Sequence, residues 1–343
     1  MTAALKVLVA SHLVRPDQND QNFTEELKTE DWKTESDVLA ALNKLGYNSV
    51  LFGIFDNIRL LEEKISEYRP DVVFNLIERF SNDPTFDQHI ASYLELIGIP
   101  YTGCGPVGMA LCKNKGLSKK ILSYHRISVP DFAVFRKGKR VARPRKLKYP
   151  IFVKPLADEA SMGISQASFV ETDDQLLDRV AFIHSQLNQD AIAEEYIDGR
   201  ELYVGVMGNL RGTLKVFPAR EMTFGQMPED GPRFASYKSK WDEKYRSKWG
   251  IKNQFARLSD AAEAKLGKVC KKIYSLLEIS GYARLDLRLT ADNKIYFIEA
   301  NPNPMFAKDE DFAMSAVKSG MSYEQLTDKI IKLGLQRGKA GGL

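Results

Sequence analysis

Carboxylate and amide side chains alternate with apolar ones in the segment 281–304, GYARLDLRLTADNKIYFIEANPNP. Because successive side chains of a strand point to opposite faces, this alternation predicts two strands that each have one polar face. On the first strand, one face holds Arg284, Asp286 and Arg288, and the other holds Leu285, Leu287 and Leu289. On the second strand, the same alternation groups Ile295, Phe297, Glu299 and Asn301.

The two strands form a hairpin in our interpretation, with a loop at residues 291–294. Pairing of Thr290 with Ile295 places Asp286 opposite Glu299, with Cβ atoms about 4.5–5.5 Å apart. Like charges at that distance repel, so a cation must lie near both carboxylates. The chemistry predicted for this hairpin is therefore cation binding.

The same register places Arg284 opposite Asn301, which offers a neutral oxygen on the face of Glu299. An all-oxygen set with few carboxylates suits Mg²⁺, with Mn²⁺ as a substitute, especially where phosphate oxygens complete the shell. The alternative is a plain ion-pair network, in which Arg284 and Arg288 neutralise the carboxylates. Asn301 favours the metal site, because an ion-pair network does not use it.

The length and composition limit the classes of protein to which this chain can belong. A chain of 343 residues predicts two or three domains, and 44% hydrophobic and 27% charged residues are typical of a globular enzyme. No apolar run is long enough to cross a bilayer, no signal-peptide layout is present, and the three cysteines have no metal spacing. We therefore expect a soluble cytoplasmic protein with no membrane partner. The basic run 136–148 lacks interleaved aromatic residues and predicts a solvated loop rather than nucleic-acid contact.

The first third of the chain alternates strand and helix patterns. Strands are predicted at 6–11, 49–54 and 71–76, and helices at 36–45, 58–68 and 86–97. This βαβαβ order predicts a parallel sheet with ligands at the carboxyl ends of its strands. The long polar loop after the first strand contains His12 and Arg15, which are candidates for contact with an anionic substrate.

The middle of the chain predicts a phosphate site. A strand ends at Lys154, a small-residue loop with Ser161 and Gly163 follows, and a second strand is expected near Ile164. Such a loop lets backbone N–H groups approach phosphate oxygens while the lysine supplies charge. Further helices are predicted at 114–124, 172–187, 259–277, 309–318 and 322–333, with strands at 191–196 and 202–207. The segment 237–249 mixes basic and aromatic residues and is expected to form a flap.

These residues, in this order, resemble the ATP-grasp superfamily and within it the D-alanine–D-alanine ligase group. The resemblance runs from about residue 71 to about residue 326. Its motifs are VFNLIERF, GIPYTGCGPVGMALCKNKGLSKKIL, FVKPLADEASMGIS, EEYIDGRELYVGV, FASYKSKW, ARLDLRL, YFIEANPNP and SGMSYEQL. It implies an α/β ATP-grasp fold with an N-terminal doubly wound domain (1–105) and two α+β subdomains (106–197 and 198–343) that sandwich ATP. It also implies a homodimer.

The resemblance further implies a role for each site residue. Lys115, Lys154 and the loop with Ser161 contact the phosphates of ATP. Adenine is contacted by Glu194 and by the backbone of Glu195, Tyr196 and Ile197, and the ribose by Glu201. Lys240 meets the γ-phosphate from the flap, Asp286, Glu299 and Asn301 hold Mg²⁺, and Arg284 faces the tetrahedral oxyanion. The implied reaction is ligation of a carboxylate to an amine through an acyl phosphate.

The chain departs from the family at the amino-acid end of the site. The region after the first strand reads SHLVRPDQND instead of a glycine-rich loop, Glu78 stands where relatives have histidine, and PNPMF follows Asn301. These departures favour an amino acid or peptide other than D-alanine. Candidate holders of an ammonium group are Glu78 and the segment 309–311. Candidate holders of a carboxylate are Arg15, Arg79 and Arg220.

Two other functions fit parts of the pattern: a kinase of the same superfamily and a nucleotide-binding protein without turnover. Arg284 argues against the kinase, because only a tetrahedral intermediate requires it. Asp286, Glu299 and Lys154 argue against a pure sensor.

Overall fold

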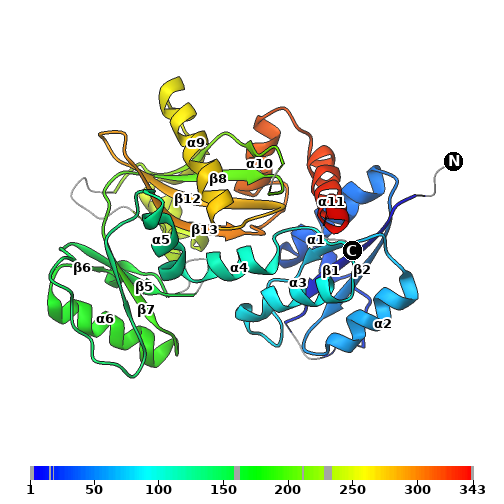
Figure 1. Cartoon of the computed structure of the whole chain (residues 1–343), viewed down its shortest axis with the longest axis horizontal. Coiled ribbons are helices and arrows are strands. Elements are labelled where there is room, and N and C mark those ends of the chain that lie inside the picture. The colour runs from blue at the N-terminus through cyan, green and yellow to red at the C-terminus, as the bar shows by residue number, and fades with distance from the viewer. Residues whose placement is uncertain are drawn as a thin grey trace.

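The computed structural model describes residues 4–14, 17, 19–157, 163–210, 212–227 and 234–340. Three sheets organise the chain (Figure 1). The first is parallel with the order β2-β1-β3, formed by β1 (Lys6–His12), β2 (Asn48–Ile54) and β3 (Val72–Leu76). Its helices are α1 (Lys33–Lys44), α2 (Ile58–Tyr68) and α3 (Asp87–Leu96). The βαβαβ prediction is confirmed.

The second sheet is antiparallel, with the order β4-β7-β5-β6. It consists of β4 (Phe132–Phe135), β5 (Ile151–Pro155), β6 (Phe169–Val170) and β7 (Ala191–Glu195). Helix α6 (Asp173–Gln186) covers it and begins after Thr172, whose hydroxyl accepts a hydrogen bond from the Gln175 N–H at 3.2 Å. The second strand predicted to begin near Ile164 is present as β6 but begins later, at Phe169, because residues 166–168 form a 3-10 turn closed by reciprocal Ser165 and Ser168 hydrogen bonds.

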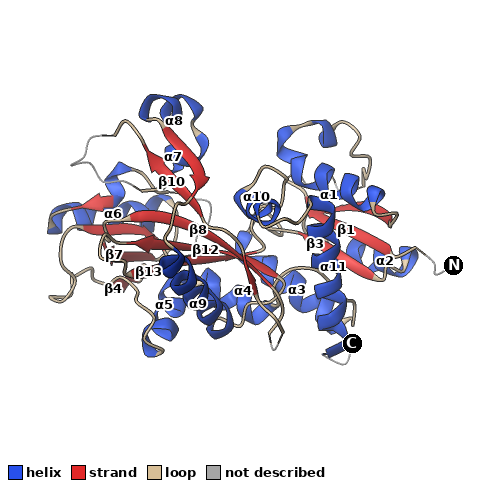
Figure 2. Ribbon diagram, turned by 90° about the horizontal axis from the view of Figure 1, so that it is seen from above, coloured by secondary structure: helices blue, strands red, loops and turns tan. Residues whose placement is uncertain are grey.

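The third sheet has the order β11-β10-β8-β12-β13, with β9 paired to β8. Its strands are β8 (Arg200–Met207), β9 (Lys215–Val216), β10 (Arg220–Phe224), β11 (Ile251–Phe255), β12 (Tyr282–Leu289) and β13 (Ile295–Pro302). Helix α9 (Asp260–Leu276) packs on the leucine face of β12. Helices α7 (Tyr237–Trp241) and α8 (Glu243–Trp249) form the expected flap, beside β10 in Figure 2.

A bulge in the β12–β13 hairpin changes the predicted register at the turn. Leu289, not Thr290, lies opposite Ile295, and the pairing shifts by one residue between Asp286 and Leu287. Ile298, between Phe297 and Glu299, therefore has no partner opposite it on β12 and is the bulge residue. As a result Ile295 and Phe297 join the leucines in the buried core, and the prediction that they share the face of Glu299 is wrong.

The end of the chain returns to the first sheet. After β13 come α10 (Asp311–Lys318) and α11 (Tyr323–Ala340), which packs on α1 and β3. Val9 and Phe74 thereby share a core with Phe306 and Ile330. The sequence missed α4 (Pro106–Lys113), which precedes α5 (Lys115–Tyr124) and connects the first sheet to the rest. No described helix combines the length and the apolar character that crossing a bilayer requires.

A close backbone contact joins the start of β12 to Gly103, in the segment that leads from the first sheet to α4. Gly281, directly before β12, has φ +71°, and a Cβ atom there would lie 2.4 Å from the Gly103 carbonyl oxygen. Gly138 has a similar φ of +76° but open space around it.

We expect Gly281→Ala to lower the midpoint of thermal unfolding much more than Gly138→Ala. Both variants carry the backbone cost of a left-handed residue, about 1–2 kcal/mol. Only Gly281→Ala must also displace a packed carbonyl, which adds about 1–3 kcal/mol. Equal midpoints for the two variants would show that the Gly281–Gly103 contact does not constrain the fold.

Candidate active site

The predicted pairing of the acidic residues is present. Asp286 lies opposite Glu299, and Arg284 lies opposite Asn301. The Arg284 guanidinium also clamps Asp286, with Nε to Oδ1 at 2.8 Å and a second nitrogen to Oδ2 at 3.0 Å. The ion-pair alternative is therefore right for Arg284 and Asp286. It is wrong for Arg288, which pairs with Glu201 at 2.8 Å and not with Glu299.

Lysines from separate elements surround Glu299. The Lys115 Nζ lies 3.7 Å from its carboxylate, and the Lys154 Nζ lies 4.0 Å away. Burial by itself raises the pKa of Glu299, but Lys115, Lys154 and Lys240 outweigh burial and bring that pKa to about 2. Burial also raises the pKa of Asp286, and Arg284 opposes the rise. The site therefore holds Glu299 ionised in a cationic environment.

Lys119 belongs to this charge cluster and was missed from the sequence. Its side chain is 0% exposed, and its Nζ lies 3.2 Å from Glu194 and donates to the carbonyl of the bulge residue Ile298. Burial lowers the pKa of Lys119 to about 8, against the opposing charge of Glu194. A signal was available: Lys119 follows Lys115 by one helical turn and so shares its face.

Glu194 connects this cluster to Lys154, since the second carboxylate oxygen lies 3.2 Å from the Lys154 Nζ. Glu194 is 3% exposed, so its negative charge is balanced mainly by these two lysines. Because Glu194 is buried between these lysines, removal of either lysine would leave its buried negative charge with one fewer partner, which is strongly destabilising.

A cleft between the second and third sheets brings together most of the residues expected to bind nucleotide. Its lining includes Lys154, Glu194, Glu195, Tyr196, Ile197, Glu201, Lys240, Asp286 and Glu299. Apolar residues that the sequence did not single out complete it: Pro130, Phe152, Ile164, Phe234 and Ile298. An apolar slot beside a cluster of cations suits a flat base joined to a polyanion.

Some groups in this cleft already have partners. The N–H groups of Glu195 and Tyr196 donate to the carbonyls of Asp131 at 2.8 Å and Pro150 at 2.9 Å. Glu201 accepts from the Tyr203 hydroxyl at 2.9 Å as well as from Arg288. A base or ribose in the cleft would therefore meet the remaining carbonyl and carboxylate oxygens of this strand and turn.

A second space, the central cavity, adjoins the cleft and measures roughly 380 Å³. Arg284, Asn301, Lys240, Glu78 and Arg220 contribute to its lining. Lys240 lines both spaces, so the flap residue lies where they meet. The flap itself contacts the second sheet's subdomain, because the Tyr237 N–H donates to the Ile164 carbonyl at 3.1 Å.

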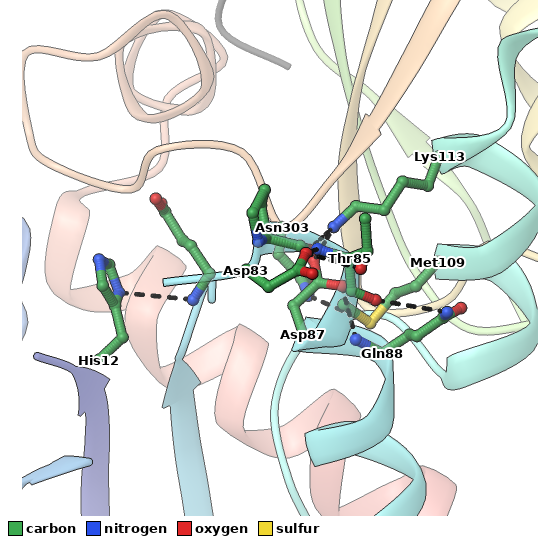
Figure 3. Close-up of polar contacts among 10 residues, drawn as sticks. His12, Asp83, Thr85, Asp87, Gln88, Met109, Lys113 and Asn303 are labelled. Carbon is green, nitrogen blue, oxygen red and sulfur yellow. Dashed lines mark hydrogen bonds and ion pairs between the residues drawn. The ribbon is translucent and has the colours of Figure 1, made fainter. Parts of the chain in front are cut away.

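Polar contacts hold several residues that line the central cavity (Figure 3). Asp87, which lines the cavity, pairs with Lys113 at 2.7 Å. Asn303 accepts a hydrogen bond from the Cys104 N–H at 2.7 Å and so connects the end of the hairpin to the segment before α4. His12, drawn at the end of β1, accepts from the Glu78 N–H at 3.5 Å.

The structure leaves only some of the predicted substrate residues available in the central cavity. Glu78 faces the central cavity, but Arg220 pairs with Asp311 at 2.9 Å, so a candidate carboxylate holder and a candidate ammonium holder neutralise each other. Arg79 has a buried Nε without a hydrogen-bond partner among the described residues. Arg15 and Ser161 lie outside the described residues.

The candidate metal ligands fit a hard cation that shares phosphate oxygens. Asp286 and Glu299 oppose each other, and Asn301 lies opposite Arg284 on the same hairpin. The buried amide nitrogen of Asn301 has no hydrogen-bond partner in the described parts of the chain, so it can donate to a phosphate oxygen while the amide oxygen serves a cation. Those parts contain no group of three or more His, Cys, Asp or Glu side chains placed to hold a metal alone. Two carboxylates and an amide would thus need further oxygens from water or a nucleotide.

Comparisons with known proteins agree with this geometry. Residues 121–332, more than half of the chain, match the family described as D-ala D-ala ligase C-terminus. The chain is 30% identical to the D-alanine–D-alanine ligase of Caldicellulosiruptor bescii, over 78% of this chain and 71% of that protein. It is 28% identical to an uncharacterized protein, y4sG, of Sinorhizobium fredii, over 89% of this chain and 88% of that one.

A solved structure shows the same fold. The D-alanine–D-alanine ligase of Bacillus anthracis, in a complex with ATP, superposes with a TM-score of 0.76 at 22% identity, and the match covers 98% of this chain and 99% of that one. The ATP-grasp prediction is therefore confirmed. With the family match over most of its length, the chain belongs to the D-alanine–D-alanine ligase family of ATP-dependent amide-bond ligases.

Proposed function

We propose that this enzyme joins the carboxylate of one amino acid or peptide to the amine of another, with ATP and Mg²⁺, through an acyl phosphate. The observation that carries the proposal is the junction of two cavities at Lys240. One side presents Lys154 and the opposed carboxylates, with Lys115 at 3.7 Å from Glu299, and the other presents Arg284 and Asn301. A nucleotide and a carboxylate can meet only where both spaces open onto each other.

The lysines reduce the repulsion between the two negatively charged reactants. A carboxylate and a triphosphate repel each other, so their negative charge must be balanced before the carboxylate oxygen attacks the γ-phosphorus and ADP leaves. Lys115, Lys154 and Lys240 supply that balance. Mg²⁺ held by Asp286, Glu299 and Asn301 would add charge neutralisation at the phosphate oxygens.

Arg284 can stabilise the negative charge that develops on the tetrahedral intermediate. When the amine attacks the acyl carbon, the carbonyl oxygen gains negative charge until the C–O bond breaks and phosphate leaves. A guanidinium aimed at that oxygen stabilises it, and loss of one such donor typically costs about 10²–10³ in rate. Asp286 holds Arg284 in a fixed orientation through two hydrogen bonds. The aromatic flap at α7 and α8 would limit hydrolysis of the acyl phosphate.

We further propose the division into 1–105, 106–197 and 198–343, with α11 packed back on the first sheet, and a homodimer in the cytoplasm. Support for the dimer comes from the family resemblance alone, and support for the compartment comes from the cysteine pattern and the sequence features described above. Sedimentation of the purified protein measures the assembly.

The direct test is phosphate release from ATP across a library of amino acids and dipeptides, each with and without hydroxylamine. A ligase of this kind yields hydroxamate, ADP and phosphate when hydroxylamine replaces the amine. A stable phosphorylated product without phosphate release would instead identify a kinase, and no turnover with any compound would contradict the proposal.

We predict that Glu299→Gln lowers kcat by about 10²-fold or more, because the neutral amide removes a ligand charge that the metal and lysines require. Steady-state ADP release measures the effect, and an unchanged thermal midpoint shows that the fold is intact. Asp292→Asn, an exposed change in the turn of the same hairpin, is the matched control and keeps normal turnover. Near-normal ADP release from Glu299→Gln would refute the metal assignment.

Lys119→Met tests whether the buried lysine positions the nucleotide site. Breaking a buried ion pair typically costs about 3–5 kcal/mol, since Glu194 is left with one fewer partner. We expect a lower thermal midpoint and a KM for ATP raised about 10-fold or more, with a smaller change in kcat. Lys120→Met, on the exposed neighbour, leaves both unchanged. A normal KM for ATP in Lys119→Met would count against the positioning role.

A further inference from the structure

Tyr203, in the middle of β8, is a buried aromatic residue to which the reaction described above gives no role. It is 2% exposed and lies opposite Asp286 in the antiparallel pair of β8 and β12. Arg284 stands two residues before Asp286 on β12, so its side chain leaves the sheet on the same face, and both Tyr203 and Arg284 line the central cavity. Tyr203 is therefore a diagonal neighbour of Arg284, within reach of a long side chain.

The ring of Tyr203 lies against the guanidinium of Arg284. The guanidinium carbon is 5.1 Å from the centre of the ring, which is within the range of a cation–π contact. The residue directly opposite Arg284 on β8 is Gly205, so this strand offers the arginine the ring at the diagonal position instead of a side chain directly opposite. The Arg284 side chain is 19% exposed, and such contacts contribute about 2 kcal/mol where the cation is desolvated.

Asp286 and Tyr203 restrict the guanidinium in different ways. The Asp286 carboxylate accepts from Nε at 2.8 Å and from a second nitrogen at 3.0 Å, and so holds one edge of the planar group. A ring against the face of the guanidinium opposes tilting about that edge. The third nitrogen has no hydrogen-bond partner among the described residues and is available to an anion in the cavity. Its direction is fixed only when both contacts are present.

The ring of Tyr203 is itself held at both ends. Its hydroxyl donates to the Glu201 carboxylate at 2.9 Å, in the cleft that is expected to bind nucleotide. The ring packs in a buried cluster with Met222 and Ile251, and side chains of α8 in the flap pack against this cluster. The orientation of the ring therefore depends on the nucleotide cleft and on the flap as well as on its own strand.

We propose that Tyr203 is a positioning residue for the ligation, because its ring orients the Arg284 guanidinium toward the oxyanion of the tetrahedral intermediate. This inference rests on the role of Arg284 in the proposed function and deepens that role. A misplacement of about 1 Å can cost about 10²-fold in rate. Loss of the ring therefore weakens the contact with the oxyanion, although the guanidinium is still present.

Two substitutions separate the ring from the hydroxyl. Tyr203→Leu removes the ring, and we expect it to lower kcat at least about 10-fold, because the oxyanion forms only during the reaction, and to change the KM for ATP less than about 3-fold. Tyr203→Phe keeps the ring and should retain kcat within about 3-fold of the parent enzyme. Both are measured with the amino acids that give the fastest phosphate release in the library.

Tyr203→Met also lacks the ring and remains informative if Tyr203→Leu fails to fold. An equal loss of kcat in Tyr203→Phe and Tyr203→Leu would overturn the proposal, and so would normal kcat in the variants without the ring.

Tyr274→Leu is the matched control for loss of a buried tyrosine. Tyr274 is 0% exposed on α9, donates to the Gly208 carbonyl at 2.8 Å and packs in the core on the leucine side of β12. We expect a lower thermal midpoint, as in Tyr203→Leu, but unchanged kcat. A similar fall of kcat in both variants would contradict the proposal.

The Arg284→Ala background shows whether Tyr203 acts through Arg284. Residues in contact have coupled effects, so we expect Tyr203→Leu to lower kcat less than about 3-fold when Arg284 is already absent. An equal fall of kcat in both backgrounds would show that the effect of Tyr203 does not depend on Arg284, and would overturn the proposal.

Crystal structures of the full-length Tyr203→Phe and Tyr203→Leu variants need no turnover. We expect the guanidinium in its present position in Tyr203→Phe, and displaced by about 1 Å or more, or in two conformers, in Tyr203→Leu. An unchanged guanidinium in Tyr203→Leu overturns the inference and leaves the ligase function standing. A displaced guanidinium, with no turnover of any compound by the parent enzyme, supports the positioning of Arg284 by Tyr203 and contradicts only the ligase function.

Discussion

The opposition of two carboxylates, the buried Asp286 and the partly buried Glu299, is the constraint around which the site is built. Like charges at facing positions of a sheet destabilise it unless cations compensate. Here Arg284 clamps Asp286, while Lys115 and Lys154 lie within 4.0 Å of Glu299. The compensation comes from a helix, a strand of another sheet and the hairpin itself. The fold must offset the repulsion between these carboxylates with cations from several elements. We therefore connect this arrangement with a reaction between charged groups.

The same constraint explains why the second and third sheets meet at this place. The second sheet supplies Lys154 and Glu194, α5 supplies Lys115 and Lys119, and the flap supplies Lys240. The bulge at Ile298 contributes twice, because it turns Glu299 toward the cleft and exposes a carbonyl that accepts from Lys119. Packing of the leucine face on α9 fixes the hairpin behind these groups.

Local patterns predicted much of this arrangement, but not the contacts between distant segments. Strand alternation was enough to place Asp286 and Glu299 on polar strand positions, since it acts over a few residues. Their pairing was predicted from a Thr290–Ile295 register that is absent, and it holds because the bulge offsets the difference. Alternation could not reveal the bulge, which depends on how Phe297 packs in a core made by α9 and β8. Likewise the partners of Arg220 and Lys119 come from segments 91 and 75 residues away, Asp311 and Glu194, which no local spacing indicates.

We propose that this hairpin holds a metal ion against the phosphates of ATP. Anomalous diffraction from crystals grown with Mn²⁺ and a non-hydrolysable ATP analogue tests it most directly. We predict a peak about 2.1 Å from oxygens of Asp286, Glu299 and Asn301, the spacing typical of a small hard cation, with the analogue's phosphates beside Lys115 and Lys154. A metal peak away from the hairpin, or phosphates bound elsewhere, would contradict the account.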